Sequence, residues 1–190
     1  MKKKQKSKGK PIVKNYGFLW ERKYIDRGSP GPNNPGSLKG FHKSRDTARD
    51  TAVDFKEQMG VYTLYDETKS IVYIGQAGNG NATLFGRLKQ HMDGGDLWNR
   101  WQYFSWIGFR EVTQKGLSNH QDAKTTVSIK YSQALNEIEG VLIEMIEPKL
   151  NKQGGKLKDA DEYFQWFDPE ISLKDIKNEV SEIKELLISP

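Results

Sequence analysis

Residues 60–75 read GVYTLYDETKSIVYIG, and this stretch decides how the rest of the chain is interpreted. Two runs rich in aromatic and β-branched residues flank the polar turn DETK, a pattern typical of an antiparallel hairpin. The runs contain two aromatic–glycine triplets, which are Gly60-Val61-Tyr62 and Tyr73-Ile74-Gly75. The two tyrosines, 11 residues apart, are expected on neighbouring strands. Most strand tyrosines are half-buried packing residues with a solvated hydroxyl, so the pair alone assigns no chemistry.

Downstream segments supply the other expected elements. Apolar periodicity predicts a helix over residues 82–92, and an aromatic run predicts a third strand over residues 101–109. A stronger helix is expected over residues 132–147, ended by Pro148, and another over residues 171–188. The order of strand, strand, helix, strand and helix predicts an α/β (α+β) fold with a mostly antiparallel central sheet flanked by helices.

The first of these helices carries two polar residues of chemical interest. Arg87 and His91 are four apart, so they lie on one face of the helix, for which Asn81 is the expected N-cap. A guanidinium can hold a phosphate through two hydrogen bonds, and an imidazole exchanges protons near neutral pH. The same spacing suits an ordinary solvated helix face, so both interpretations stay open at this point.

Glu139 stands out in the second helix because of its neighbours. The positions that adjoin it on the helix surface are Leu135, Leu142, Ile143 and Ile146. A carboxylate among apolar side chains is costly to bury unless a metal ion or another cation compensates it. The alternative is a glutamate at the edge of the apolar stripe, solvated or in a salt bridge.

Taken together, these residues resemble the GIY-YIG nuclease superfamily over residues 58–152. The first triplet corresponds to the GIY element, and the second is an intact YIG element. The family's helical Arg, the His one turn later, the metal-binding Glu and the terminal Asn fall on Arg87, His91, Glu139 and Asn151. Two departures are visible: Gln76 stands where the family often has Lys or Arg, and residues 110–130 are long enough to hold an insertion.

The resemblance implies a metal-dependent endonuclease that hydrolyses phosphodiester bonds of DNA with a single ion; RNA is not excluded. Glu139 is the implied ligand of Mg²⁺ or Mn²⁺, which would polarise the scissile phosphate and stabilise the leaving oxygen. Because no second carboxylate is paired with Glu139 in the sequence, two-metal chemistry is not expected.

The resemblance also implies roles for the remaining site residues. Tyr62 would be the general base toward the attacking water, as a tyrosinate or through a relay with His91. Arg87 would stabilise charge on the phosphoryl oxygens, Tyr73 would position the nucleophile or the phosphate, and Asn151 would brace the site by hydrogen bonds. Gly60 and Gly75 are expected to be structural, allowing close approach of the backbone to the substrate.

Charge is unevenly distributed along the chain. The net charge is +5, but residues 1–14 contain seven lysines and no acidic residue, so the positive excess lies in this tail. We expect residues 1–14 to be a disordered basic tail, either merely solvated or gripping phosphates in a salt-dependent manner. The candidate nucleic-acid contacts are Lys2, Lys3, Lys4, Lys6, Arg87, Lys89, Arg100 and Arg110.

Composition also bears on compartment and partners. The chain has no cysteine, which excludes disulfides and cysteine-based zinc sites or nucleophiles, and fits a reducing, cytoplasmic environment. Its N-terminus has no apolar segment of signal-peptide type, and no stretch of 18 apolar residues occurs. Neither a signal peptide nor a membrane span is therefore expected.

Two extensions flank the family-like region. Residues 15–57 combine an aromatic patch with a Gly/Pro-rich stretch, and are expected to be an ordered loop packed on the body or a partner-binding arm. Residues 153–190 are expected to carry an amphipathic helix that docks on the body, forms a homodimer seam or recruits a partner protein. About half of the aromatic residues in the strand at 101–109 should lie in the core, leaving the others free to stack on bases.

Two further functions stay open beside the nuclease. One is a catalytically weak nucleic-acid-binding module that keeps the fold, and the other is a subunit that recruits a partner with the main activity. All expected catalytic positions carry the residue type that the family uses, which favours a nuclease over a catalytically weak module. Such a nuclease would act in restriction or phage defence, in a mobile element or in repair.

Overall fold

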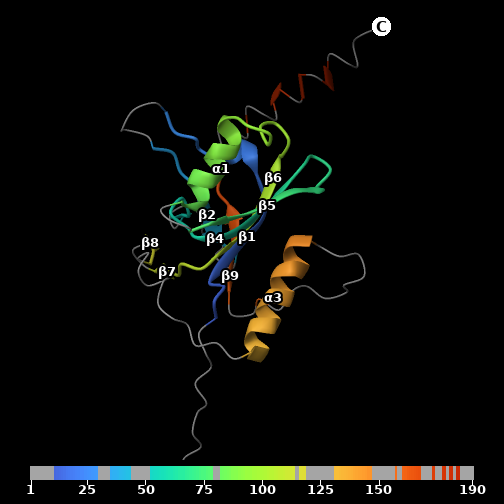
Figure 1. Cartoon of the computed structure of the whole chain (residues 1–190). Helices are drawn as coiled ribbons and strands as arrows, with labels where there is room; N and C mark the ends of the chain where they lie inside the picture. The colour runs from blue at the N-terminus through green and yellow to red at the C-terminus, as the bar shows by residue number, and fades with distance from the viewer. Residues whose placement is uncertain are drawn as a thin grey trace, which may run out of the picture.

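The computed structural model describes the chain in several ranges and seven single positions. The ranges are residues 11–29, 35–43, 52–78, 82–113, 116–118, 131–146, 157 and 160–167, and the single positions lie between 173 and 184. Residues 131–136 are described by their backbone alone. Helix α1 (Leu84–Asp93) and helix α3 (Tyr131–Ile146) lie on opposite sides of a seven-stranded sheet (Figure 1).

The sheet runs in the order β3-β2-β9-β1-β6-β4-β5. Its strands are β1 (Asn15–Glu21), β2 (Lys39–His42), β3 (Val53–Asp54), β4 (Gly60–Tyr65), β5 (Ile71–Ala77), β6 (Tyr103–Gly108) and β9 (Asp161–Gln165). Every neighbouring pair is antiparallel except β1 and β9, which are parallel. The prediction of a mixed α/β fold with a mostly antiparallel sheet is therefore confirmed. A 3-10 helix η1 (Arg22–Tyr24) and a short hairpin of β7 (Val112–Thr113) and β8 (Gly116–Leu117) complete the described elements.

The predicted hairpin forms β4 and β5, and the predicted third strand forms β6 beside β4. In β4, Tyr62 and Leu64 join the core cluster that contains the apolar side of α1. Val61 packs on the cluster that includes Met145 of α3, and Thr63 contacts that same residue. Alternation along one strand thus divides the molecule into an α1 face and an α3 face.

Helix α1 begins one turn before the polar pair Arg87 and His91. Thr83 is the N-cap, because its hydroxyl accepts a hydrogen bond from the backbone N–H of Gly86 at 3.2 Å. The expectation of Asn81 as N-cap was wrong: the helix starts two residues later, where a threonine in extended conformation can cap the first turn. The helix buries Leu84, Phe85, Leu88 and Met92 over the sheet. Beneath them lies a core rich in large aromatic side chains, among them Trp20, Phe55, Tyr62, Trp101, Phe104 and Trp106.

Helix α3 is held on the other face by polar contacts as well as by packing. The hydroxyl of Tyr65 donates to the backbone oxygen of Met145 at 2.6 Å, and the hydroxyl of Thr63 lies 3.3 Å from the sulfur of the same methionine. Because Tyr65 and Thr63 both belong to β4, the C-terminal end of α3 is fixed against the central hairpin strand.

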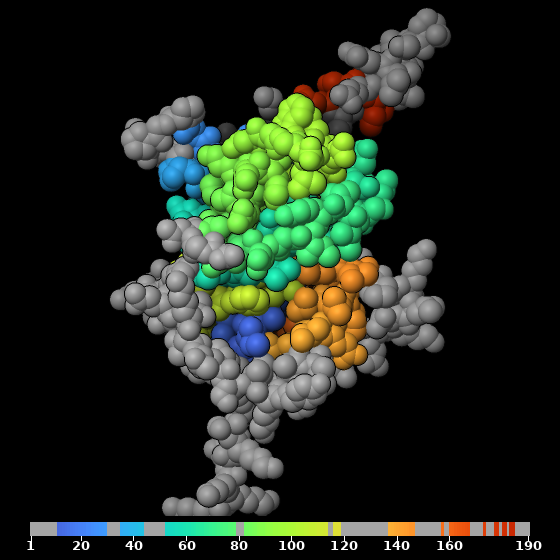
Figure 2. Space-filling view, viewed as in Figure 1, coloured from blue at the N-terminus to red at the C-terminus, as the bar shows by residue number. Residues whose placement is uncertain are grey.

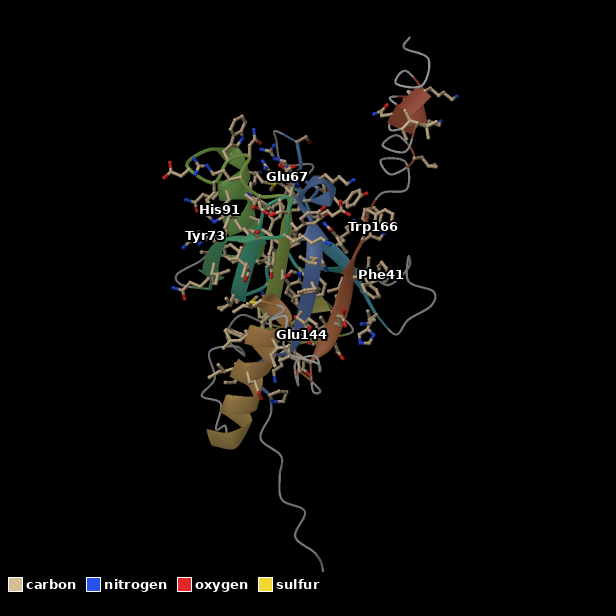
Figure 3. All side chains as sticks on the ribbon, turned by 90° about the vertical axis from the view of Figure 1, so that its right-hand side faces the viewer. Phe41, Glu67, Tyr73, His91, Glu144 and Trp166 are labelled. Atoms are coloured by element: carbon tan, nitrogen blue, oxygen red, sulfur yellow. The ribbon has the colours of Figure 1, made fainter. Side chains whose placement is uncertain are left out.

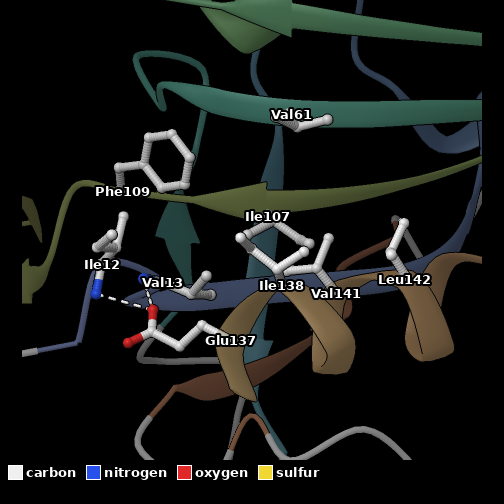
Figure 4. A pocket seen from close by; sticks show the side chains of 9 residues that line it. All are labelled: Ile12, Val13, Val61, Ile107, Phe109, Glu137, Ile138, Val141 and Leu142. Atoms are coloured by element: carbon white, nitrogen blue, oxygen red, sulfur yellow. Dashed lines mark hydrogen bonds between the residues drawn. The ribbon is translucent and has the colours of Figure 1, made fainter. Parts of the chain in front are cut away.

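A cavity of about 290 Å³ lies between α3 and the sheet (Figure 4). Its lining is apolar apart from Glu137, whose carboxylate accepts the backbone N–H groups of Ile12 and Val13 at 2.9 and 3.0 Å. That carboxylate ties the segment before β1 to the helix. With its one charged group already engaged, the cavity offers no chemistry for phosphoryl transfer.

The two flanking segments contribute strands to the central sheet. Residues 15–57 were expected as an ordered loop that packs its aromatics on the body, or as a partner-binding arm. Trp20 does pack in the core, but the described part of this segment forms strands β1, β2 and β3 rather than a loop, and β1 lies between β9 and β6. The prediction failed because the ladder partners of β1 lie far along the chain: Asn15 pairs with Gly108 and with Asp161. β9, from the segment 153–190, lies between β1 and β2.

Several expectations fall on residues that are only partly described. Residues 1–10 of the basic tail lie outside the described residues. For residues 11–14 the expectation of disorder was wrong: Val13 is buried in a core cluster, and the backbone N–H of Lys14 donates to the Gly108 carbonyl at 2.8 Å. In the helix expected at 171–188, the seven described positions have helical backbone, and Leu173, Val180 and Ile183 are exposed rather than buried against the body. Among the described residues, no helix is both long enough and apolar enough to cross a membrane.

Candidate active site

The position of Tyr62 is set by strand register. Tyr62 is 1% exposed and lies opposite Gly75 on β5 and Trp106 on β6. A β-carbon at position 75 would lie 2.4 Å from the Tyr62 hydroxyl oxygen and 2.5 Å from its Cζ. The glycine of the YIG element therefore makes room for the tyrosine of the GIY element. The packing agrees with the expected structural role of Gly75, and the expected approach of backbone to substrate stays a prediction.

Tyr62 contacts His91 of α1. The Tyr62 hydroxyl and His91 Nε2 are 2.8 Å apart, a hydrogen bond whose donor depends on the imidazole tautomer. The ring of Tyr73 packs edge-on against the His91 ring, with centroids 5.0 Å apart, and lies 6.1 Å from the ring of Tyr62. Figure 3 shows Tyr73 and His91 side by side. Tyr73 is 37% exposed, so the cluster runs from a buried phenol through a half-buried imidazole to a tyrosine at the surface.

Arg87 adds a positive charge one turn before His91 on the same side of α1. Its Nη1 donates to Gln90 Oε1 at 3.3 Å, while its Nε is buried and has no hydrogen-bond partner. A buried donor without a partner costs free energy, and an incoming phosphate could meet this N–H only if the Arg87 side chain moved. Gln90 was not among the predicted site residues, although its three-residue spacing from Arg87 was the signal that could have found it.

The environment sets the protonation of the cluster. Burial, reinforced by Tyr73 and opposed by Arg87, raises the pKa of the Tyr62 phenol well above its usual range. Burial and the positive charge of Arg87 lower the pKa of His91. At neutral pH, Tyr62 is therefore a phenol and His91 a neutral imidazole. The proton of the attacking water was expected to be removed either by a Tyr62 tyrosinate or through a relay with His91. These protonation states disfavour the tyrosinate and favour a route in which His91 receives the proton.

Glu139 is not brought to this cluster. It is exposed on α3, and α3 covers the face of the sheet opposite to Tyr62, as the contact between Met145 and Thr63 shows. In Figure 2, the blue-green hairpin separates the green α1 from the orange α3. Asn151 lies outside the described residues. The structure thus gathers Tyr62, Tyr73, Arg87 and His91 and leaves the predicted metal ligand on another surface.

The described residues do not by themselves fit a metal ion beside His91. Within the part of the chain that the structure describes, no group of three or more His, Asp or Glu side chains could hold an ion. A site with a single carboxylate would not form such a group. Glu139, however, is the implied carboxylate, and its helix lies across the sheet from the clustered side chains.

The predicted nucleic-acid contacts differ in their availability. Arg100 is exposed, and the Lys89 ammonium lies 3.4 Å from a backbone carbonyl oxygen. Arg110 is used inside the fold: its Nε donates to the Ser118 carbonyl at 2.7 Å, and Nη1 donates to the Glu57 carbonyl. Its predicted contact with phosphate is therefore replaced by a structural role. The four tail lysines lie outside the described residues.

The aromatic residues of the segment 101–109, which contains β6, divide as expected. Trp101, Phe104 and Trp106 are fully buried, and Tyr103 and Phe109 are half-buried. The buried three cannot stack on a nucleic acid without unfolding the core, so this strand provides packing rather than a stacking surface.

Comparison of the chain with protein-family models, with curated proteins and with solved structures returned no match. The resemblance to the GIY-YIG superfamily therefore rests on the order and spacing of its own residues, and what it implies about activity is developed as a proposal.

Proposed function

We propose that the chain is an endonuclease that hydrolyses phosphodiester bonds of DNA in the manner of the GIY-YIG superfamily. The observation that carries the proposal is the 2.8 Å hydrogen bond between the Tyr62 hydroxyl and His91 Nε2, formed beside Arg87 and Tyr73. A neutral base, a fixed cation and a surface hydroxyl in one cluster are the groups that attack of water on a phosphate requires.

In this mechanism, His91 takes up the proton of the attacking water on Nδ1, in the tautomer whose Nε2–H donates to the Tyr62 oxygen, and its lowered pKa keeps the imidazole neutral beforehand at pH 7. Tyr62, which is buried and remains a phenol, fixes the orientation of the ring through its hydrogen bond to Nε2. The positive charge of the Arg87 guanidinium balances the charge that develops on the phosphoryl oxygens. Tyr73, at the exposed edge, donates its hydroxyl to the phosphate.

Dependence on Mg²⁺ or Mn²⁺ belongs to the proposal through the resemblance. A bound ion would supply Lewis-acid stabilisation of the phosphate and of the leaving oxygen. Since Glu139 lies across the sheet from His91, the steps above are those of the four clustered side chains alone.

Nicking of supercoiled plasmid tests the proposal, with Mg²⁺, with Mn²⁺ and with chelator alone. His91→Gln should slow nicking by about 10²-fold or more, the scale expected when a general base is lost. His42→Gln is the matched control, because His42 is a half-buried histidine of β2, 3.2 Å from Asp161 and at the other end of the sheet. If the parent protein nicks plasmid neither with Mg²⁺ nor with Mn²⁺, the proposal that the chain is a nuclease is contradicted. Equal rates for His91→Gln and the parent contradict the assignment of the base.

The position of Glu139 favours a second candidate, a nucleic-acid-binding module with little catalytic power. Glu139→Gln separates the two functions. A nuclease that uses Glu139 loses metal-dependent nicking in this variant while its unfolding midpoint is unchanged, since the side chain is exposed. A parent chain that binds DNA but never cuts it belongs to the second class.

A further inference from the structure

Helix α3 covers only part of its face of the sheet. It packs over β4 and β6, through Thr63 and Ile107. Farther along the same face, Tyr16 of β1 is hydrogen-bonded to Glu162 of β9 at 3.3 Å, and the sheet continues into β2. In the described ranges, no helix packs on β9 and β2. The side chains that these strands turn to this face therefore form part of the protein surface.

Aromatic and basic side chains alternate along β2, and the β9 side carries aromatic residues beside the acidic Glu162. Lys39, Phe41 and Lys43 follow one another at two-residue spacing along and just beyond β2, as do Phe164 of β9 and Trp166 just beyond β9. Phe41 is the cross-strand partner of Phe164, with ring centroids 5.7 Å apart. We call these five residues the aromatic–lysine strip.

Each lysine of the strip lies over a ring. The Lys39 ammonium is 5.2 Å from the centroid of Trp166, and the Lys43 ammonium is 5.6 Å from the centroid of Phe164. Phe164 is 41% exposed, and Phe41 and Trp166 are half-buried, so all three offer part of a ring to a ligand. The charge is partly balanced, because Lys43 pairs with Glu162 at 2.7 Å. Lys39 makes no ion pair among the described residues.

The same composition continues beyond the end of β9. Phe167 is 45% exposed, and its ring lies 5.1 Å from the ring of Tyr24. The Lys23 ammonium stands 4.8 Å from the centre of the Tyr24 ring and also pairs with Glu21 at 3.5 Å. The strip and this continuation make a surface where rings and cations occur together over several residues.

We propose that the aromatic–lysine strip binds single-stranded nucleic acid, with bases stacked on its rings and phosphates beside its lysines. Base stacking on aromatic side chains, combined with cations that follow the backbone, is how sequence-tolerant single-strand binding works. An apolar partner surface would leave the Lys39 ammonium without a counter-charge, whereas Lys43 already pairs with Glu162. A duplex keeps its bases stacked on each other, so it offers the phosphates but not the base faces.

The strip is separate from the candidate active site. β9 and β5 are four strand spacings apart in the sheet order, which corresponds to about 19 Å, and the strip faces away from α1. Figure 3 shows Phe41 and Trp166 on the side of the molecule away from His91 and Tyr73. Nucleic acid is chosen as ligand class in accord with the proposed function, but binding at the strip requires neither a metal nor cleavage.

Fluorescence anisotropy with labelled oligo(dT) of about 20 nucleotides, and with a duplex of equal length, tests the inference in chelator, where no cleavage occurs. Phe164→Ala should weaken single-strand binding about 5- to 150-fold, the range for removing one base–aromatic stack, and should change duplex binding much less. Lys39→Gln changes an exposed side chain, so it should weaken single-strand binding and reduce the salt dependence of that binding by about one released counterion. The controls are Lys69→Gln, whose ammonium lies 5.8 Å from the Tyr103 ring, and Ile138→Ala, which removes an exposed apolar side chain on α3.

Tryptophan fluorescence gives a second readout that a merely structural role would not move. Of the five tryptophans, Trp20, Trp101 and Trp106 are buried, so quenching by oligo(dT) reports on Trp98 and Trp166. Trp166→Phe should keep the affinity, because phenylalanine also stacks, and lose most of the quenching. Trp98→Phe should retain the quenching.

Three results overturn the inference. The first is an oligo(dT) affinity that is unchanged in both Phe164→Ala and Lys39→Gln. The second is fluorescence quenching by oligo(dT) that persists in Trp166→Phe. The third is a parent protein that is a dimer and that Phe164→Ala converts to a monomer. The test also stands apart from the nuclease: a parent that binds oligo(dT) through the strip but never nicks plasmid refutes the proposed function and supports this inference. If the parent nicks plasmid and the strip variants bind oligo(dT) as tightly as the parent does, the proposed function is supported and this inference is refuted.

Discussion

Replacing Gly75 with alanine tests whether the triplets work as a packing unit. The added methyl group would lie 2.4 Å from the Tyr62 hydroxyl, 2.5 Å from its Cζ and 2.7 Å from Cε1 of Tyr73. Ordinary carbon contacts begin near 3.4 Å, so the Tyr62 ring must move by about 1 Å. Tyr62 is 1% exposed, and close-packed surroundings leave it little space to move into.

Overpacking of this kind costs about 1–3 kcal/mol. For a chain of 190 residues, that corresponds to a lowering of Tm by about 2–12 °C. The shift of the ring also lengthens the Tyr62–His91 hydrogen bond, so nicking should slow as well as stability fall. Urea unfolding followed by circular dichroism and plasmid nicking on the same preparations measure the two effects.

Gly86→Ala is the matched control. A β-carbon at Gly86 would meet Thr83 Oγ1 at 3.3 Å and no other atom within 4 Å, and the position is an exposed one in α1. Because alanine favours helix over glycine by up to about 1 kcal/mol, this variant should be as stable as the parent or more stable. A Gly75→Ala variant whose unfolding midpoint and nicking rate match those of Gly86→Ala would refute the packing argument. In the Tyr62→Phe background, Gly75→Ala should cost less, since the closest atom is gone.

Three further predictions concern the cluster and the tail. Tyr62→Phe should slow nicking by at least about 10²-fold with little change in DNA affinity at fixed salt, because it leaves His91 Nε2 without its partner; a parent-like rate would show that Tyr62 only packs. Because the pKa of His91 is lowered in the folded protein, the unfolded chain takes up a proton on this histidine first as pH falls below about 6.5. Mild acid therefore lowers the stability of the fold. His91→Gln should show a smaller loss of urea midpoint between neutral and mildly acidic pH than the parent. Deleting residues 1–10, with their six lysines, should weaken DNA binding and reduce its slope against log salt by up to about 5, with cleavage positions unchanged; a changed cleavage pattern would mean that the tail reads sequence.

Local pattern was sufficient for the elements that carry the cluster. The hairpin, the third strand and both helices lie within a few residues of their expected bounds, because each has a clear period of two or of 3.6. The meeting of Tyr62 with His91 also follows from local order, since α1 returns over the strands that immediately precede it. β1 and β9 have no such signal: they pair with each other over a separation of 146 residues. β1 also stands before a Gly/Pro-rich stretch that suggests a loop.

Periodicity could not place Glu139. It identifies an apolar stripe around Leu142 and Ile146, and that stripe exists, but these side chains are 51% and 48% exposed. The helix instead turns Val141 and Met145 to the sheet. Which of two neighbouring stripes packs inward depends on the shape of the opposing sheet surface, and a single helix sequence does not contain that shape.

The insertion of β9 between β1 and β2 has a consequence for the nascent chain. β2 and β3 leave the ribosome early, yet within the described residues β2 has only the two-residue pairing with β3 as a ladder until residues 161–165 arrive. Until then, one side of β1 is an open strand edge, which is a template for pairing with other chains. Contacts so distant in sequence also slow folding. A fragment that stops short of β9 would keep every residue of the Tyr62–His91 cluster and still be prone to aggregate.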